Sequence, residues 1–332
     1  MRIVCFHLNQ VGDLAFSLPA LKCVRDSFPG SHITSVARPI LAQILDATGL
    51  TDDVLDRPTG LGPGKLKLAR VLRSGRYDLA VVFSQSAECA ILAYLSRAPE
   101  RIGFVSTSLG ALLTHRVEFH HPPSTANNLR LIEAAGCRVT KFDYVGLVRP
   151  PAEQSRRAED MLARHGIAPS DVLVSLAPGA SSRRSVKEWT DEGFAAVAAH
   201  VLQRGARVAI LGTQPADGIT SLCPGAVDLS GETSLGDVLA LAARSRVLVA
   251  VDSGILHLAA AAGTKVVGLY GPSDPRITGP QGDGHVIVTS GADCAPCIAT
   301  DCRRARKCML DITAQEVIDA VDAVLGKEAA VQ

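Results

Sequence analysis

The sequence is poor in aromatic residues, carries almost no net charge and has no long apolar run. Aromatic residues make up 4% of its 332 residues, and 34 Lys and Arg face 33 Asp and Glu, which leaves a formal net charge of +1. Nucleic-acid binding normally uses clustered Lys and Arg, so the balanced charge argues against such a partner. No apolar run reaches the roughly 18–20 residues of a membrane helix, and the N-terminus becomes polar at His7, too early for a signal peptide. We therefore expect a cytoplasmic protein with at most peripheral membrane contact.

Two common nucleotide-binding motifs are also missing. No G-x-G-x-x-G follows a candidate strand, and the segment around Gly64 and Lys65 lacks the first Gly and the final Ser or Thr of a P-loop. A dinucleotide-dependent dehydrogenase and a P-loop ATPase are therefore disfavoured. With 47% hydrophobic residues, the chain is still long enough and apolar enough for two folded domains.

Short apolar runs alternate with longer amphipathic stretches along the whole chain. The runs are nearly continuously apolar, as in parallel strands covered by helices on both faces. The predicted strands are Arg2–His7, Ile33–Ala37, Asp78–Phe83, Val172–Leu176, Arg207–Leu211, Val247–Val251 and Lys265–Tyr270. The predicted helices are Leu14–Ser27, Glu153–His165, Asp191–Arg204, Leu235–Ala243, Ile255–Ala262 and Thr313–Leu325. This alternation predicts an α/β protein with two doubly wound domains.

A proline pair, Pro150 and Pro151, marks the expected boundary between these domains. We expect an N-terminal domain over residues 1–150, a C-terminal domain over residues 151–312 and a final helix over residues 313–326. In that helix, Thr313 and Glu316 have the spacing of a capping box.

Two segments that follow predicted strands carry groups suited to chemistry. After the first strand, Gly12 allows a tight turn and Asp13 follows at the start of a helix, either as a catalytic carboxylate or as an ordinary helix-terminal acid. After Val247–Val251, the run Asp252-Ser253-Gly254 opens an Ala-rich helix that also carries His257. Such a helix N-terminus can hold an anion, or it can be a simple Asp/Ser cap with a buried histidine.

A third segment follows the first strand of the C-terminal domain. It holds the hydroxyls of Ser181 and Ser182, the guanidinium groups of Arg183 and Arg184, and Lys187. Hydroxyls and cations together suit a diphosphate, although the same residues would also form an ordinary solvated basic loop.

Nine cysteines divide into five scattered residues and a group of four within fifteen residues. The simplest interpretation of the five scattered cysteines is that they are small buried hydrophobic residues. The group, Cys294, Cys297, Cys302 and Cys308, has the spacing C-x₂-C-x₄-C-x₅-C, which can surround a structural Zn or Fe ion. Two disulfides or four free thiols are the alternatives.

Taken in order, several motifs resemble those of glycosyltransferase family 9, the ADP-heptose:lipopolysaccharide heptosyltransferases. The matching pieces are Gly12-Asp13-Leu14, Leu18-Pro19-Ala20-Leu21, Phe28-Pro29, Arg101-Ile102-Gly103-Phe104, Pro178-Gly179, Lys187-Glu188-Trp189, Asp252-Ser253-Gly254, His257-Leu258-Ala259-Ala260-Ala261 and Gly271-Pro272-Ser273. The resemblance implies a GT-B fold, in which two Rossmann-like domains face each other across a cleft. The N-terminal domain would bind the acceptor and the C-terminal domain the nucleotide sugar. The final helix would cross back onto the N-terminal domain, as in GT-B relatives. It also implies an inverting transfer without a metal cofactor for catalysis. Many relatives carry a similar Cys-rich loop, and an iron-bound form is known among autotransporter-type members.

The resemblance also implies roles for individual residues. Asp13 would be the general base; Gly12, Lys65 and Arg101 would lie on the acceptor side, with Lys65 otherwise part of a solvated face. The donor would meet the following residues: Ser181, Ser182, Lys187, Asp252, Ser253, Gly254, His257 and, for the ribose, Asp217 or Gln214. His7 departs from the pattern, because many relatives carry Arg or Lys at that position.

We therefore expect transfer of heptose from ADP-heptose to an acceptor hydroxyl, foremost of the lipopolysaccharide core. A protein or a small metabolite could replace this acceptor without a change in chemistry. An inactive nucleotide-sugar-binding protein is the alternative outside catalysis, and a redox or iron–sulfur protein built on the four cysteines is the remaining one.

Overall fold

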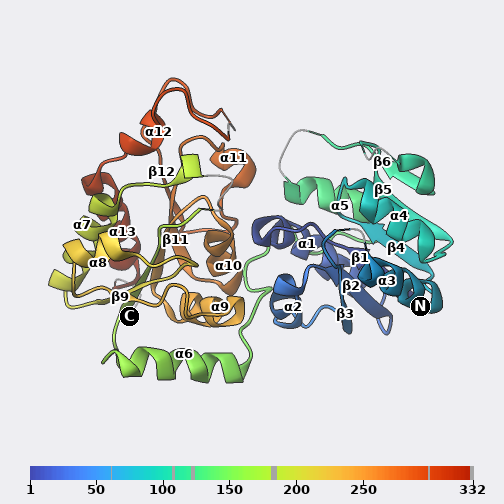
Figure 1. The fold of residues 1–332 in the computed structure, drawn as a ribbon, viewed down its shortest axis with the longest axis horizontal. Helices are drawn as coiled ribbons and strands as arrows, with labels where there is room; N and C mark the ends of the chain where they lie inside the picture. The colour runs from blue at the N-terminus through green and yellow to red at the C-terminus, as the bar shows by residue number, and fades with distance from the viewer. Residues whose placement is uncertain (61, 107–108, 121–123, 181–184, 298–299, 330–332) are drawn as a thin grey trace. The chain divides into compact units, whose positions relative to one another are not determined.

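The computed structural model describes the chain except for residues 61, 107–108, 121–123, 181–184, 298–299 and 330–332 (Figure 1). It divides into two compact units, Met1–Val148 and Arg149–Gln332. Among the described residues, no helix combines the length and the apolar character that crossing a membrane requires.

In the described part of the first unit, six parallel strands form a sheet in the order β3-β2-β1-β4-β5-β6. The strands are β1 (Arg2–Phe6), β2 (His32–Ala37), β3 (Asp53–Asp56), β4 (Leu79–Val82), β5 (Glu100–Phe104) and β6 (His115–Val117). The helices are α1 (Val11–Ser27), α2 (Pro39–Asp46), α3 (Pro63–Ser74), α4 (Ala87–Leu95), α5 (Ser124–Ala134) and the short η1 (Gly110–Leu112). Helix α1 packs on α5, and α4 packs on both α3 and η1.

The described part of the second unit has a matching sheet of six parallel strands in the order β12-β11-β10-β7-β8-β9. The strands are β7 (Leu173–Ala177), β8 (Arg207–Ile210), β9 (Val227–Asp228), β10 (Val247–Val251), β11 (Lys265–Leu269) and β12 (Val286–Val288). The helices are α6 (Ala152–Arg164), η2 (Ser185–Lys187), α7 (Asp191–Gln203), α8 (Asp217–Leu222), α9 (Leu235–Arg244), α10 (Gly254–Ala262), α11 (Pro275–Thr278), α12 (Lys307–Leu310) and α13 (Ala314–Ala329). The fully buried valines of β7 and β10 form the centre of its core.

The final helix, α13, packs on α7 and against β10, β11 and β12 of the second unit. Its first turn has the predicted capping box: Thr313 N donates to Glu316 Oε2 at 2.8 Å, and Glu316 N donates to Thr313 Oγ1 at 3.3 Å. Val317 and Val321 are fully buried. The helix is therefore an integral part of this unit's core.

Candidate functional site

In both sheets, two strands that are distant in sequence lie side by side at the centre. β1 pairs with β4 in the first unit, and β7 pairs with β10 in the second. The chain winds outward in opposite directions from each of these pairs. Ligands of open α/β sheets bind outside the carboxyl ends of the strands at such a point, so the segments after β1, β4, β7 and β10 are where a site is expected.

In the second unit, an ion pair joins the segments that follow β7 and β10. Lys187 ends η2 after β7, and Asp252 is the first residue after β10. Lys187 Nζ lies 2.5 Å from Asp252 Oδ2 and also donates to the backbone oxygen of Asp252 at 3.5 Å. Both side chains are largely buried, with exposed fractions of 14% and 7%. The structure thus brings together two residues that were predicted from separate motifs.

The Asp252 carboxylate is strongly held in its charged form. Burial by itself raises its pKa, but hydrogen bonds from His257, Lys187 and Ser273 and the charge of Lys187 outweigh burial and lower the pKa to about 2. His257 Nε2, on α10, lies 3.7 Å from Asp252 Oδ1. Asp252 is therefore an anion at neutral pH, and it fixes the position of the Lys187 ammonium group.

Helix α10 begins directly beside this pair. Ser253 is its N-cap and Gly254 its first residue. The Ser253 hydroxyl is buried and has no hydrogen-bond partner within the described residues. A buried hydroxyl without a partner costs free energy, and the first N–H groups of a helix also lack partners in the helix. Together with Lys187, these groups form a site suited to an anion such as a phosphate.

The cysteine-rich segment contacts two loops beside this site: the loop of Lys187 and the loop of Pro272 and Ser273, which follows β11. Cys297 N donates to the backbone oxygen of Pro272 at 2.9 Å, and Arg306 Nη1 donates to the backbone oxygens of Ser185 and Glu188 at 3.3 Å each. Gly271 is needed where the segments touch, because a Cβ there would lie 2.5 Å from Met309 Sδ. The segment therefore connects the Ser273 loop to the Lys187 loop.

The four predicted metal ligands lie in this segment as free thiols. Burial raises the pKa of Cys308, and so do the charges of Cys294, Cys297 and Cys302. These thiols are thus close enough to influence one another, and thiolates are suitable donors for Zn or Fe. Among the described residues, however, no three of these thiols are placed to hold a metal ion.

In the first unit, Asp13 lies where the sequence predicts it. It is half-buried in the first turn of α1, directly after Gly12 and beyond the carboxyl end of β1. Lys65 lies in the first turn of α3 and pairs with Glu88 of α4, with Nζ 2.7 Å from Oε1. Lys65 follows β3 and Glu88 follows β4 in the chain, so both residues come after the carboxyl end of a strand, as Asp13 does.

Arg101 is directed elsewhere. Its guanidinium group donates to the backbone oxygens of Ala98 and Leu112 at 2.6 and 2.8 Å. Ala98 precedes β5, so these contacts hold the side chain toward the amino edge of the sheet, opposite the edge that carries Asp13.

The sequence did not reveal Arg57, a buried cation at the same edge of the first sheet as Asp13. It follows β3, is 4% exposed, and donates to Asn9 Oδ1 and to Cys89 Sγ. The short strand that places it at this edge was not predicted. If a strand had been predicted over Asp53–Asp56, Arg57 would have been placed directly after its carboxyl end. It would then have been a candidate site residue, as Asp13 and Asp252 were.

His7 does not replace the cation that many relatives carry at its position. It is fully buried, with Nδ1 3.2 Å from Ser17 Oγ and Nε2 3.0 Å from Ser35 Oγ. Burial, and then the charge of Arg57, lower its pKa to about 3. His7 is therefore neutral at physiological pH.

The remaining predicted donor residues are only partly described. Asp217 is exposed at the start of α8, after β8, and Gln214 is exposed in the preceding loop. Both lie beyond the carboxyl edge of the second sheet. Ser181 and Ser182 lie outside the described residues.

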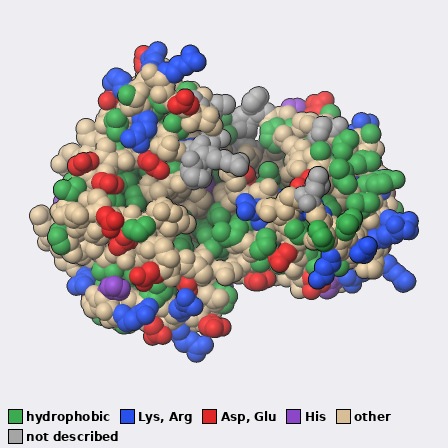
Figure 2. Space-filling view, in the orientation of Figure 1, with side chains coloured by type: hydrophobic (Ala, Val, Ile, Leu, Met, Phe, Trp, Pro, Cys, Tyr) green, Lys and Arg blue, Asp and Glu red, His purple; other side chains and the backbone are tan. Residues whose placement is uncertain are grey.

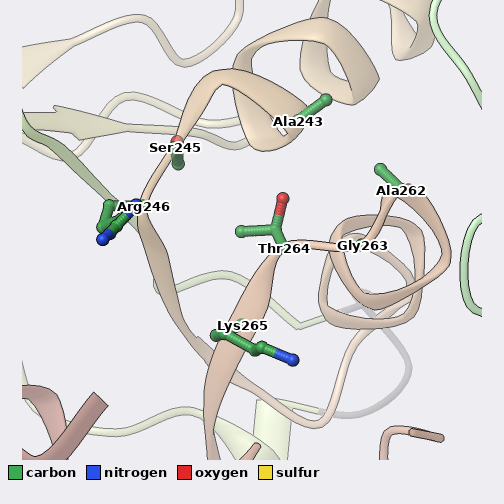
Figure 3. Close-up of a pocket in the computed structure, with 7 residues that line it drawn as sticks. All are labelled: Ala243, Ser245, Arg246, Ala262, Gly263, Thr264 and Lys265. Atoms are coloured by element: carbon green, nitrogen blue, oxygen red, sulfur yellow. The ribbon is translucent and has the colours of Figure 1, made fainter. Parts of the chain in front are cut away.

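A shallow pocket opens at the other edge of the second sheet (Figure 3). It is lined by Ala243, Ser245, Arg246, Ala262, Gly263, Thr264 and Lys265. Its hydroxyls are already bonded: Thr264 Oγ1 donates to the backbone oxygen of Ala242 and Ser245 Oγ to that of Leu241, both at 2.7 Å. The pocket lies where β10 and β11 begin, so it is separate from the Lys187–Asp252 site.

Comparison with known proteins identifies the family. The model of glycosyltransferase family 9 (heptosyltransferase) matches residues 65–307, nearly three quarters of the chain. The chain belongs to this family.

Similar proteins extend the match over the whole chain. Lipopolysaccharide heptosyltransferase 2 of Escherichia coli K12 is 24% identical over 99% of this chain and 100% of its own. A solved family 9 glycosyltransferase from Veillonella parvula DSM 2008 is 23% identical, with a TM-score of 0.85 over 98% of this chain and 97% of its own. The solved E. coli ADP-heptose LPS heptosyltransferase II is 20% identical, with a TM-score of 0.81 over 99% of this chain and 100% of its own.

As a member of family 9, the protein is a glycosyltransferase with the GT-B fold, and both predictions are confirmed. The family match contains Lys187, Asp252, Ser253 and His257 but begins after Asp13. The motifs around Lys187 and Asp252 therefore lie inside the stretch that the family model matches.

Proposed function

We propose that this glycosyltransferase transfers heptose from ADP-heptose to a hydroxyl of the lipopolysaccharide core. The proposal depends on one observation: a buried Lys187–Asp252 pair lies beside the N-terminus of α10, where the Ser253 hydroxyl has no partner among the described residues. A nucleotide diphosphate supplies the anionic oxygens that such a site can bind. The names of the relatives favour heptose as the sugar and lipopolysaccharide as the acceptor.

On the donor side, the Lys187 ammonium group and the first N–H groups of α10 contact the diphosphate. The Ser253 hydroxyl donates to a phosphate oxygen, and Gly254 lets the diphosphate approach the backbone closely. Asp252 touches the sugar while it positions Lys187, and His257 holds Asp252 in turn. Asp217 or Gln214 contacts the ribose, and Ser181 and Ser182 complete the diphosphate contacts.

On the acceptor side, Asp13 acts as the general base. The acceptor oxygen forms a bond to the anomeric carbon while the bond from that carbon to the diphosphate oxygen breaks. Asp13 takes the proton of the acceptor hydroxyl, and ADP leaves with the bonding electrons. Attack from the face opposite the leaving group inverts the configuration.

This mechanism does not require a metal ion in the reaction. Negative charge develops on the departing diphosphate, and groups already oriented toward that charge stabilise it most effectively. Lys187 and the α10 N–H groups can fill this role. Gly12, Lys65 and buried Arg57 supply the surroundings of the acceptor. Arg101 has no such contact in the arrangement described, because its guanidinium group is bonded at the opposite edge.

We also propose a structural Zn or Fe ion held by Cys294, Cys297, Cys302 and Cys308. Four protein ligands leave no open position for substrate. The ion would therefore stabilise the segment that connects the two donor-side loops, and it would take no part in the transfer.

Incubation of the protein with ADP-heptose and candidate acceptors, followed by mass spectrometry, tests the proposed function. A heptose-sized mass increase on a lipopolysaccharide core acceptor, with release of ADP, is expected. An increase found only on a protein or on a small metabolite would overturn the acceptor assignment. ADP binding without any transfer would instead indicate a nucleotide-sugar-binding protein.

A further inference from the structure

We infer that the outer surface of α3 and α4 in the first unit docks on an anionic lipid bilayer. This surface, the α3–α4 face, presents five large exposed apolar side chains: Leu66, Val71, Ile91, Tyr94 and Leu95. Figure 2 shows hydrophobic side chains gathered there, with Lys and Arg side chains around them, over the region where Figure 1 places α3 and α4.

The apolar side chains of this face lie on two helices that pack together. α3 packs on α4, and the inner face of α3 is buried through Leu68 and Leu72. Leu66 and Tyr94 nevertheless remain 62% and 53% exposed. In the second unit, exposed apolar residues such as Leu222 and Leu310 lie on separate elements instead. A contiguous exposed apolar surface is typical of an interaction site, whereas single exposed residues are ordinary.

The charges around this apolar surface are almost all positive. Between Gly62 and Tyr77 the sequence carries five cations and no acid. Glu88 of α4 forms an ion pair with Lys65. Lys67, Arg70 and Arg73 of α3 are exposed. Basic residues interleaved with aliphatic ones are typical of helices that lie in the interface of an anionic membrane.

Tyr94 is held in a position suited to that interface. The Arg101 guanidinium carbon lies 5.7 Å from the centre of the Tyr94 ring, a cation–π distance. Tyrosine is enriched at the headgroup level because its ring is apolar and its hydroxyl is polar. This contact also gives a role to Arg101, whose side chain points away from Asp13.

Charge complementarity favours a bilayer over two other partners, a second copy of this chain and a nucleic acid. If a second copy of this chain docked by the same face, the exposed cations of the two copies would oppose each other. A nucleic acid would match the cations, but it would leave the aliphatic side chains Leu66, Val71 and Leu95 without apolar partners. Anionic phospholipids offer both negative headgroups and an apolar layer.

Vesicle flotation tests this inference. The protein is mixed with vesicles of equimolar phosphatidylglycerol and phosphatidylcholine, and with vesicles of phosphatidylcholine alone. We expect binding to the anionic vesicles only, weakening as salt is raised. Lys67→Glu combined with Arg70→Glu should weaken it by at least about 25-fold, since each basic residue near such a surface contributes about fivefold. Leu66→Gln with Val71→Gln should weaken it about tenfold.

Matched controls lie in the second unit. Arg156→Glu with Arg164→Glu reverses two exposed charges of α6, and Leu222→Gln removes an exposed leucine of α8. These controls should bind vesicles like the parent protein. Every variant should retain the parent's melting temperature and ADP affinity, which separates lost docking from lost folding and from failure of the proposed function.

Three results would overturn the inference. The first is equal binding to the neutral and the anionic vesicles. The second is α3 variants that bind vesicles like the parent protein. The third is a different occupant, shown either by self-association that the α3 variants abolish or by a complex with duplex DNA at physiological salt without vesicle binding.

Discussion

Lys187 is the residue on which the proposed donor binding most directly depends. In the Lys187→Ala variant, a charge-assisted contact to the diphosphate is lost, and Asp252 is left buried without its main cationic partner. We expect ADP binding to weaken by more than about 1 kcal/mol in isothermal titration calorimetry. Ser253→Ala should cost less, because the backbone N–H groups of α10 remain.

Lys265→Ala is the matched control for this measurement. Lys265 belongs to the same unit, but its ammonium group donates to the backbone oxygen of Asp283, and it lines the pocket at the amino edge of the sheet. Its removal should leave ADP affinity unchanged. Unaltered affinity in Lys187→Ala would refute the assignment of this loop to the donor.

His7 should make the stability of the protein depend on pH. In the unfolded chain a histidine takes up a proton near pH 6.5, whereas burial and the charge of Arg57 lower the pKa of native His7 to about 3. The unfolded state therefore binds more protons below pH 6.5, so this contribution to stability is complete above that pH and is lost as the pH falls toward 3. Between pH 7 and 5 the loss should be about 2 kcal/mol.

Urea unfolding at several pH values measures this effect. His7→Asn should flatten the pH dependence of the free energy of unfolding, whatever its effect on stability at pH 7. Parallel profiles for His7→Asn and the parent protein would show that burial does not lower the pKa of His7.

The residues around the Lys187–Asp252 pair could be singled out from the sequence because each lies in a short local motif. Asp252, Ser253 and Gly254 are consecutive, and they follow a strand whose apolar run is unmistakable. Arg57 gave no such signal: the strand before it, Asp53–Asp56, begins and ends with aspartate and has no buried residue. Its burial depends on Asn9 and Cys89, which are distant in the sequence.

Whole strands also differ in whether the sequence predicts them. Every predicted strand is observed to within about a residue at either end, and in the second unit these strands, β7, β8, β10 and β11, are the four inner ones. The strands that were missed include the outermost ones of both sheets, β3, β6, β9 and β12. An outer strand is short and covered on fewer sides, so it needs no continuous apolar run.

The capping box of α13 should contribute measurably to stability. Thr313→Ala removes the hydroxyl that accepts from Glu316 N, and such a loss typically costs about 1 kcal/mol. Because α13 belongs to the core of the second unit, urea unfolding should detect it. Gln315→Ala, on the exposed side of the same helix turn, is the control and should have little effect.

The cysteine-rich segment should affect the proposed donor site, although none of its residues belongs to that site. If a structural ion holds the segment, anaerobically purified protein should contain about one Zn or Fe per chain by elemental analysis. Cys294→Ser should release the ion, lower the melting temperature and weaken ADP binding, because the segment supports the loops of Lys187 and Ser273. Metal-free parent protein of equal stability and activity would contradict this prediction.

At the scale of the whole molecule, the proposed base and the proposed donor contacts belong to different units. Asp13→Ala should therefore keep the ADP affinity of the parent protein while transfer falls by about 10²–10⁴-fold, the usual contribution of a general base. Asp26→Ala, at the other end of α1, is the control and should retain transfer. A large loss of ADP affinity in Asp13→Ala would place this carboxylate on the donor side instead.

The two sheets share one strand order when each is numbered from its own first strand. In both units the two central strands, β1 and β4 or β7 and β10, divide the sheet into two groups of three strands. No repeat is visible in the sequence. The chain passes from the first unit to the second between Val148 and Arg149. Each unit has its own core, so substitutions that adapt the first unit to a new acceptor would leave the proposed donor site of the second unit intact.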